Sequence, residues 1–519
     1  MYEKKVVGMD KRDAAQKYVD ILARAFQMLS SFSDFQLYIL KTAEYDLSIS
    51  EDIKNRIHAT KSEDVSVLLQ TVQELLDEMM HQPEGRRLSY AVSICLCMDQ
   101  QICYADDGED SSSVWKKGRM NLHSLVPIKS GRQPIMVKTL NQNKEETGIC
   151  IAPKFPVSVA LTSTGTETVR RSLASKRALY GINGSLVNVS YYPWKKDTPD
   201  VSHIILPERL LSKEETLLPE ETRIVFSPLT DKPDLLNKGA PAVQTVEGIS
   251  CRTVVVNGVT DPDYIEERFT DNWNSACEMA PDIFFAPEML ATDKMVQIEN
   301  QGSVFLKPLL KAVAMAGRKA PRLTLLPTYS RDRTNRLLVF DETGRHWGTQ
   351  FKRVPYVNQR DGLMEALDLP PANDVLMIHM KNQQRIAVVI CAEFLSSPGY
   401  VNDFLCGQLG ATLILVPSYS PGERDFIDSL PALKPFGTSV VWGNCCGAVH
   451  GEDEQPPKRI IGACSYAGID EPVRFGSVNR CGFRCDSCKT CLFLVNIPTE
   501  VAQDKPDSSR APSILHVCG

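Results

Sequence analysis

Residues 385–421 read RIAVVICAEFLSSPGYVNDFLCGQLGATLILVPSYSP, and this stretch decides the fold class of the C-terminal half of the chain. An apolar run ends at Cys391, and a second run, LILV, ends just before Pro417. Near-continuous runs of Val, Ile and Leu are typical of strands buried on both faces of a parallel sheet. The segment between the two runs is helix-like, so the stretch predicts a strand–helix–strand unit.

The same alternation continues over residues 246–498. GISCRTVVVNGV, DIFFAPEML and RLTLLPTYS have the pattern of strands, while DPDYIEERFTDNWNSACEMA and LLKAVAMAGRK have that of helices. RLLVFDETGRHWGTQFKR predicts a hairpin that turns at residues 342–344. Alternating strands and helices imply sheets covered by helices, so an α/β domain is expected here.

The rest of the chain divides into three regions. Residues 1–85 place apolar residues at three- and four-residue spacing, as in AAQKYVDILARAFQMLSSF, and predict a helical region that Pro83 ends. Residues 86–243 alternate short apolar runs such as SYAVSICLCM with Pro, Gly, Ser and Asn, which favours a mixed α/β or β-rich domain of unknown role. Residues 499–519 form a polar tail.

Composition excludes several classes of protein. A chain of 519 residues is long enough for several domains. Its net charge of −6 gives no support for a nucleic-acid-coating protein. It has no apolar run long enough to span a membrane, and the N-terminus MYEKKVVGMDKRD lacks the apolar core of a secretory signal. A cytoplasmic location is therefore expected, with the 16 cysteines mostly reduced.

Three ionisable residues close predicted strands. Glu288 closes DIFFAPE, Lys352 closes HWGTQFK and Cys391 closes RIAVVIC. Side chains at strand ends reach the edge of a sheet, where ligands tend to bind. Any one of these residues has a plain structural reading: Cys391 could pack as an inert thiol, and Lys352 could lie on a solvated face. The ordered set of three favours an active site.

This ordered set resembles the nitrilase (carbon–nitrogen hydrolase) superfamily. DIFFAPEML is similar to that family's apolar strand followed by Pro-Glu, and TNRLLVFDETGRHWGTQFKRVPY is similar to its Asn-containing hairpin that leads to a lysine. The stretch around Cys391 resembles the family's nucleophile strand and helix, and GTSVVWGNCCG its later strand that ends in Asn-x-x-Gly. The resemblance covers residues 246–498 and implies an αββα sandwich.

The resemblance also implies roles for individual residues. Cys391 would be the nucleophile, Glu288 the general base and acid, and Lys352 the positive charge that faces the oxyanion. Ala392 would supply a backbone N–H to the oxyanion, and Glu365 is the candidate for the family's second glutamate. The implied reaction is hydrolysis of a non-peptide amide or carbamoyl bond, less readily a nitrile, through a thioester. This reaction needs no cofactor. Members of the family usually associate through their sandwiches, so the resemblance also implies a homodimer or larger homo-oligomer.

The sequence departs from the family after the nucleophile. Ala-Glu-Phe-Leu follows Cys391, where many members carry an aromatic residue, an acid and then Arg-Phe-Pro-Glu. Glu393 in this segment is expected to be a structural acid that orients the loop, not a base. The departure puts the substrate in question more than the fold.

A cysteine-rich segment, RCGFRCDSCKTCLF, offers a possible metal site. Zinc and iron–sulfur sites use closely spaced cysteines, but four this close rarely surround one zinc. No metal is therefore expected, and a reduced cysteine-rich hairpin is the preferred interpretation. The candidate ligands are Cys481, Cys485, Cys488 and Cys491.

Two other functions stay open. The nitrilase-like region could be a non-catalytic scaffold or sensor in a multidomain protein, for example in antiviral defence. The second alternative is a nucleic-acid enzyme centred on the middle domain. It rests on a four-residue segment that matches the metal-binding motif of reverse transcriptases, Tyr104-Ala105-Asp106-Asp107. Only 103 residues precede this motif, which is short for a polymerase, and nucleic acid is therefore not the expected partner.

Overall fold

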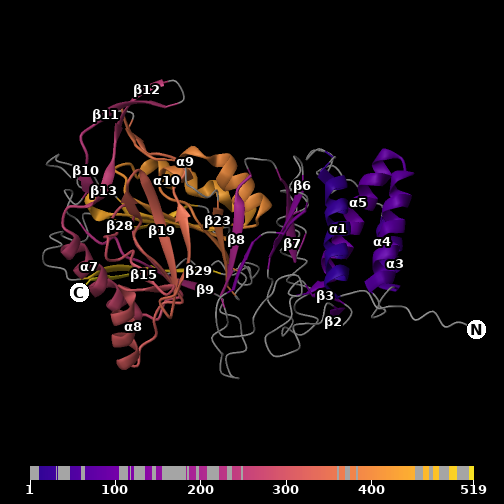
Figure 1. Ribbon diagram of the computed structural model, residues 1–519, viewed down its shortest axis with the longest axis horizontal. Helices are drawn as coiled ribbons and strands as arrows, with labels where there is room; N and C mark the ends of the chain where they lie inside the picture. Colours follow the sequence, from indigo (N-terminus) through magenta and orange to yellow (C-terminus); the bar gives the residue numbers. More distant parts are fainter. Residues whose placement is uncertain are drawn as a thin grey trace, which may run out of the picture. The chain divides into compact units, whose positions relative to one another are not determined.

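The chain folds into two compact units in the computed structural model (Figure 1). The first comprises residues 1–198, 205–209 and 407–410, and the second comprises residues 199–204, 210–406 and 411–519. The structure describes residues 11–30, 32, 47–59, 65–103, 115–116, 119–121, 135–138, 140–142, 148–154, 183, 186, 188–194, 198–206, 221–230, 236–246, 249–358, 362–368, 374–380, 384–449, 460–466, 471–477, 490–498 and 514–518.

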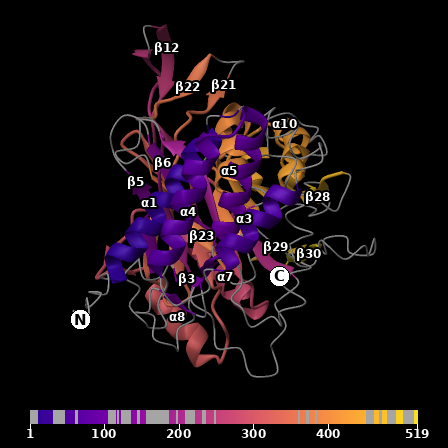
Figure 2. The same ribbon diagram turned by 90° about the vertical axis from the view of Figure 1, so that its right-hand side faces the viewer.

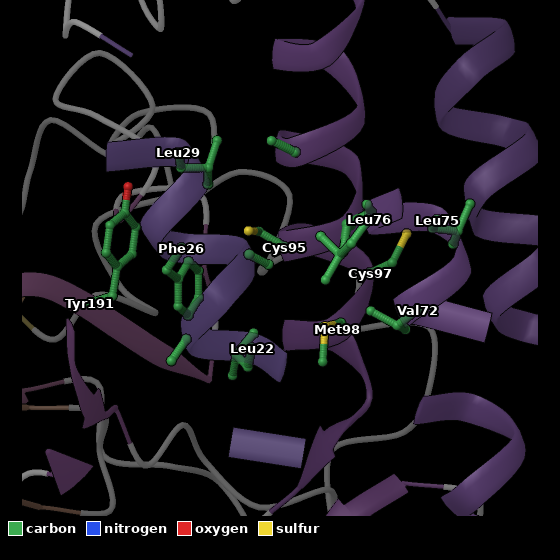
Figure 3. Packing of buried hydrophobic residues seen from close by; sticks show 14 of the residues in the cluster. Leu22, Phe26, Leu29, Val72, Leu75, Leu76, Cys95, Cys97, Met98 and Tyr191 are labelled. Atoms are coloured by element: carbon green, nitrogen blue, oxygen red, sulfur yellow. The ribbon is translucent and has the colours of Figure 1, made fainter. Parts of the chain in front are cut away.

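Four helices form most of the described part of the first unit, and Figure 2 shows them side by side. They bury one face each because their apolar residues recur every three or four positions. Figure 3 shows the resulting core, in which Leu22, Phe26 and Leu29 lie close to side chains of the other helices. The helices are α1 (Lys11–Ser30), α3 (Leu47–Ala59), α4 (Val65–Met80) and α5 (Glu84–Gln100).

Helix α5 corrects one expectation. SYAVSICLCM, grouped with the strand-like runs of the middle region, lies within this helix, and Pro83 caps its start. Ala91, Ile94, Cys95 and Met98 are fully buried. Their spacing is helical, but the apolar residues between them hide that period.

A small antiparallel sheet completes the core of the first unit. It contains β5 (Leu140–Gln142), β6 (Gly148–Pro153) and β7 (Val189–Trp194) in that order. The rings of Phe26 and Tyr191 stack with their centroids 4.3 Å apart. The carboxylate of Asp99, just before the end of α5, accepts hydrogen bonds from the N–H groups of Asn188 and Val189 at 2.9 and 3.0 Å. The short strands β1 (Ile102–Cys103), β2 (Trp115–Lys116) and β3 (Arg119–Asn121) pair separately, and β4 spans Ile135–Lys138.

The second unit contains two large sheets. In the first, the order is β18-β19-β17-β14-β9-β29-β30, and β20 pairs with β19. Its strands are β9 (Glu221–Phe226), β14 (Ile283–Phe285), β17 (Leu323–Leu325), β18 (Tyr329–Arg331), β19 (Thr334–Asp341), β20 (His346–Phe351), β29 (Cys491–Pro498) and β30 (Ile514–Cys518). β9, β14 and β17 are parallel neighbours, and β14 and β17 lie in the runs DIFFAPEML and RLTLLPTYS that predict strands.

The second large sheet contains the strand that leads to Cys391. Within the second unit its order is β28-β27-β26-β25-β24-β23-β8. The strands are β8 (Asp200–Ile205), β23 (Asp374–His379), β24 (Arg385–Val388), β25 (Leu413–Ser418), β26 (Ser439–Asn444), β27 (Ile460–Ser465) and β28 (Val473–Ser477). β24, β25 and β26 are parallel, which confirms the strand–helix–strand unit predicted around Cys391.

Side chains of the two large sheets contact each other. The ring of Phe226 on β9 lies against Gly443 on β26, where any Cβ would clash with it. Phe475 on β28 lies near both Phe226 and Phe493, with ring centroids 6.3 and 5.4 Å apart. The sheets therefore share an apolar interface.

Helices cover the other faces. α7 (Pro262–Glu278) and α8 (Leu306–Met315) share one buried cluster with side chains of β9, β14, β19 and β29. On the other sheet, Phe426 of α10 stacks on Trp442 with the ring centroids 5.1 Å apart. Asp261 begins α7 by accepting a hydrogen bond from the N–H of Tyr264 at 3.1 Å, and Pro262 is its first residue. The remaining helical segments are α9 (Ala392–Ser396), η5 (Gly399–Gln408), α10 (Arg424–Ser429), η6 (Leu430–Phe436) and α11 (Cys446–Val449).

A smaller sheet extends from the second unit and has the order β11-β12-β22-β21. The upper part of Figure 1 shows β11 and β12. The strands are β11 (Ala242–Val246), β12 (Ile249–Val254), β21 (Val357–Asn358) and β22 (Leu363–Glu365). Two further two-stranded sheets pair β10 (Leu236–Lys238) with β13 (Val256–Val259) and β15 (Ile298–Glu299) with β16 (Gly302–Ser303).

The second unit starts earlier in the chain than the domain predicted from residue 246. β9 pairs with β14 and β29, and β8 belongs to the other large sheet. The Pro- and Gly-bearing segment before residue 243 therefore lies within this unit and connects β9 to the small sheet. None of the helices that the structure describes is long and apolar enough to cross a membrane.

Candidate active site

Four strands carry ionisable side chains to one place. Glu288 follows β14 and Lys352 follows β20, both in the first large sheet. Cys391 follows β24 of the second large sheet, and Glu365 ends β22 of the small sheet. The structure thus brings together the four side chains that the sequence singled out, although they come from three different sheets.

Lys352 lies at the centre of this group. Its Nζ donates hydrogen bonds to Glu288 Oε1 at 2.7 Å and to Glu365 Oε2 at 2.5 Å. The side chains of Lys352 and Glu288 are fully buried, and that of Glu365 is 5% exposed. An ion pair without water is stable only when its remaining polar atoms are also bonded.

Neutral donors complete the bonding of both carboxylates. Asn335 Nδ2 donates to Glu288 Oε1 at 2.9 Å and to Glu365 Oε1 at 3.3 Å. The backbone N–H of Tyr356 donates to Glu365 Oε2 at 3.0 Å, and that of Tyr419 donates to Glu288 Oε2 at 3.2 Å. Tyr419 directly follows strand β25. The next residue, Ser420, is held by Asn444, whose Oδ1 accepts from the N–H of Ser420 and whose Nδ2 donates to its C=O.

Cys391 lies at a strained turn between strand and helix. Its backbone has φ 50° and ψ −114°, which a residue with a side chain rarely adopts. The N–H of Cys391 donates to the C=O of Pro417 at 3.0 Å, and its C=O accepts from Phe394 at 3.0 Å. Such strain costs about 1–3 kcal/mol and persists where the surroundings enforce it, as in many active sites. The turn holds the thiol within hydrogen-bonding reach of Glu288.

Burial controls the protonation of the group. Burial, and then the charge of Glu288, raise the pKa of the Cys391 thiol well above its ordinary value. Burial also raises the pKa of Glu288, and Glu365 adds to this rise, while Lys352 opposes it. Burial lowers the pKa of Lys352, but the two glutamates raise it more, so this amine stays charged. The thiol is therefore neutral at rest and needs a base to become a nucleophile.

Glu393 connects the turn at Cys391 with the end of strand β20 next to Lys352. Its Oε2 accepts from the N–H of Ile390 at 2.9 Å, and its Oε1 accepts from the N–H of Arg353 at 2.5 Å. The residue is buried, and burial raises its pKa to about 7 in spite of these two donors. Both carboxylate oxygens are thus used on backbone groups, as expected for an acid that orients the loop.

The other candidates have different outcomes. Ala392 is buried and begins α9 directly after Cys391, where its N–H could serve the oxyanion. Cys491 begins β29, and its Sγ lies 3.6 Å from His516 Nε2. Cys481, Cys485 and Cys488 lie outside the described residues, as does the motif Tyr104–Asp107. Among the residues that the structure does describe, no group of three or more His, Cys, Asp or Glu side chains could hold a metal ion.

Sequence reasoning missed three donors of the site. Asn335 was noted only as part of a hairpin, although a polar side chain that alternates with Leu337 and Val339 in a buried strand needs a partner. The N–H groups of Tyr356 and Tyr419 could not be found from sequence, because a backbone donor leaves no trace in residue identity.

Amidases from Nesterenkonia are among the solved structures that match this chain. An amidase from Nesterenkonia sp. is 14% identical, with 56% of this chain and 95% of that one covered and a TM-score of 0.33. A variant of the Nesterenkonia AN1 amidase that carries the acetamide moiety of fluoroacetamide on its active-site cysteine is 16% identical, with 56% and 96% covered and a TM-score of 0.34. Another variant, described as from the nitrilase superfamily, is 15% identical with a TM-score of 0.33 over 56% of this chain and 96% of its own.

The nitrilase superfamily printed for one of these variants is also the family that the sequence motifs resemble. No protein-family model and no curated protein matches the chain.

Proposed function

We propose that the second unit is a cysteine hydrolase that cleaves a non-peptide C–N bond of a small amide or carbamoyl compound through a thioester. The observation that carries the proposal is the buried contact of Glu288 with Lys352 and with the thiol of Cys391. A carboxylate that contacts both an ammonium and a thiol brings together the groups that acyl transfer needs: a base, an oxyanion stabiliser and a nucleophile.

In the first half-reaction, Cys391 attacks the carbonyl carbon of the substrate. Glu288 takes the thiol proton, a C–S bond forms, and the carbonyl π electrons move to oxygen. When the tetrahedral intermediate collapses, the C–N bond breaks and Glu288 gives its proton to the leaving nitrogen. The raised pKa of Glu288 suits both steps, because a carboxyl that holds a proton more tightly is a stronger base.

In the second half-reaction, water replaces the amine. Glu288 takes a proton from the water as it attacks the thioester carbon. The C–S bond then breaks, the carboxylic acid leaves, and the proton on Glu288 returns to sulfur. Every proton that moves passes through one carboxylate, so no cofactor is needed.

Lys352 stabilises the oxyanion in this scheme. An ammonium has three N–H donors, and two of those of Lys352 bind the glutamates. The third is assigned to the oxyanion, with the N–H of Ala392 as second donor. Loss of one such donor typically raises the barrier by about 3–4 kcal/mol.

The architecture supports the same assignment. We propose an αββα sandwich for the second unit, because its two large sheets contact each other at Phe226 and Gly443. The buried cluster of α7 and α8 covers one outer face, and the stacking of Phe426 on Trp442 covers part of the other. In such a sandwich, strand ends from both sheets meet at one edge, which is how Glu288 and Cys391 come into contact.

Mass spectrometry of the intact chain tests the proposal. The protein is mixed with a panel of small amides and carbamoyl compounds, and the mass of an acyl group is expected on Cys391 in digested peptides. Cys391→Ala should abolish the adduct, while Cys406→Ala, a change at another buried thiol, should not. Product acid released by the unmodified chain, at a rate at least about a hundred times that of Cys391→Ala, is also expected.

Two outcomes would contradict the proposal. Acid release that survives Cys391→Ala would remove the nucleophile from the mechanism. A chain with no adduct and no turnover on any compound, although Cys391 remains reduced, would favour the scaffold or sensor interpretation.

A further inference from the structure

Asn335 makes a second bridge between the two glutamates of the site. Its Nδ2 contacts Glu288 Oε1 at 2.9 Å and Glu365 Oε1 at 3.3 Å. Lys352 Nζ contacts the same two carboxylates at 2.7 and 2.5 Å. The four side chains therefore form a closed ring in which each donor holds both acceptors.

The charges show why one bridge is not enough. Two buried carboxylates face a single ammonium, so Lys352 alone leaves the ring one negative charge in excess. Buried carboxylates that lack donors become protonated, because burial disfavours the charged form. The amide of Asn335 supplies two N–H donors without adding charge, and both are directed at these carboxylates.

The orientation of the amide follows from the same contacts. With the amide reversed, its oxygen would face two carboxylate oxygens, and all three would be acceptors. Only the orientation with Nδ2 toward the glutamates gives favourable contacts. The backbone of Asn335 is held in place as well, since its C=O accepts a hydrogen bond from the N–H of Lys352 at 2.8 Å.

The ring also distinguishes the two oxygens of Glu288. Lys352 and Asn335 both bind Oε1, whereas Oε2 accepts a longer bond, from the N–H of Tyr419 at 3.2 Å. An oxygen that already accepts hydrogen bonds from an ammonium and an amide is a poor proton acceptor. Proton transfer from Cys391 is thereby directed to Oε2.

We propose that Asn335 is a positioning residue that keeps Glu288 ionised and turned so that Oε2 receives the proton of Cys391. This role rests on the proposed function, because it assigns Asn335 to the general base of that reaction. It acts through Glu288 and not on the substrate, so its loss should change the ionisation of the site.

The test compares Asn335→Leu, which is close in size but has no donor, with Asn335→Ser, which keeps one. Thr334→Ala is the control, because Thr334 is the preceding residue on β19 and its hydroxyl bonds to the C=O of Arg331. None of these changes removes the backbone bond to Lys352. The full-length proteins are treated with iodoacetamide at a series of pH values, and alkylation of Cys391 is measured by peptide mass spectrometry.

In the unmodified chain, alkylation of Cys391 should rise with pH as Glu288 ionises. Asn335→Leu should move this rise to higher pH by at least about one unit, so that alkylation on the acidic side falls about tenfold. Asn335→Ser should give a smaller shift in the same direction, and Thr334→Ala none. Folded Asn335 variants that keep the profile of the unmodified chain would overturn the proposal.

Thermal unfolding gives a second measurement that needs no access to the thiol. Asn335 stabilises the ionised carboxylate of Glu288, so the loss of stability in Asn335→Leu should be larger at neutral pH and shrink as the pH falls through the raised pKa of Glu288. A loss of stability that is equal at every pH would mean a packing role only, and would also overturn the proposal.

The two proposals can fail separately. Alkylation requires a reactive thiol beside Glu288 but no hydrolysis. A shifted alkylation profile without turnover on any amide would keep the role of Asn335 and remove the proposed function, while turnover with an unshifted profile would do the reverse.

Discussion

At the scale of single residues, the site depends on one buried ammonium. Lys352 is the charged partner of both Glu288 and Glu365, and its side chain is fully buried. Removing one partner from a buried ion pair usually costs about 3–5 kcal/mol, because the other partner is left charged and without compensation. Lys352 is therefore expected to matter for stability as well as for the oxyanion.

Lys352→Met should test both roles. We expect a loss of about 3–5 kcal/mol in the free energy of unfolding at neutral pH and a loss of turnover of at least about a hundredfold. The stability loss should diminish at acidic pH, because protonation of Glu288, whose pKa is raised by burial, removes a charge that needs a partner. Denaturant unfolding at several pH values measures it, with the exposed Lys307→Met on α8 as a control. A loss that grows as the pH falls would contradict the assignment.

At the scale of elements, the site exists because strand ends from different sheets are held together. Glu393 makes one such connection, between the turn after β24 and the strand end after β20. The guanidinium of Arg353 lies over the ring of Tyr400, 5.1 Å from its centroid, which adds a second contact between the same two regions. The position of Cys391 relative to Lys352 therefore depends on these contacts as well as on the strands themselves.

Glu393→Gln gives a pH-dependent prediction. The pKa of Glu393 is raised from 4.5 to about 7, so between these values the folded protein binds a proton that the unfolded chain releases. Its contribution to stability accordingly falls as the pH rises through this range. The variant lacks this titration, so its stability relative to the unmodified chain should improve from acidic pH to about pH 7.

Thermal unfolding at several pH values measures this difference, with Glu423→Gln as the matched control on a carboxylate that also accepts from a backbone N–H, that of Ile460. A constant difference between the Glu393 variant and the unmodified chain at every pH would contradict a raised pKa.

Elements were predictable from the sequence where one period dominates. The buried strands β14, β24, β25 and β26 lie where the apolar runs place them, and helix α7 lies in the helix-like segment DPDYIEERFTDNWNSACEMA. Helix α5 was not predicted, because further apolar residues lie between its buried ones. No clearly polar face therefore shows the helical spacing in the sequence. The order of strands could not be predicted either, since β9 pairs with β29 across a separation that no local pattern reports.

At the scale of the whole molecule, the sequence predicted which residues form the site but not how they balance one another. Strand ends and residue types identified Glu288, Lys352 and Cys391. The shared hydrogen bonds of Asn335 and the backbone donors of Tyr356 and Tyr419 depend on three sheets meeting, which is a property of the fold alone. In the first unit, the described residues form a helical core packed on a small sheet.

Phe26→Ala tests whether the first unit governs the second. Phe26 is fully buried in the helical core and stacks on Tyr191, so its truncation should cost about 3–5 kcal/mol in the stability of that unit. Each unit has a hydrophobic core of its own, and we therefore expect the rate of adduct formation on Cys391 to stay within about twofold of that of the unmodified chain.

The matched control for this experiment is Phe269→Ala, which removes a buried ring from the core of the second unit and should impair the reactivity of Cys391. Differential scanning calorimetry would assign the two unfolding transitions, and peptide mass spectrometry would follow the thiol. Phe26→Ala could instead abolish adduct formation on Cys391 while the second unit stayed folded. The reactivity of the thiol would then depend on the helical unit. That result would favour a hydrolase or sensor whose response is set by the state of its N-terminal helices.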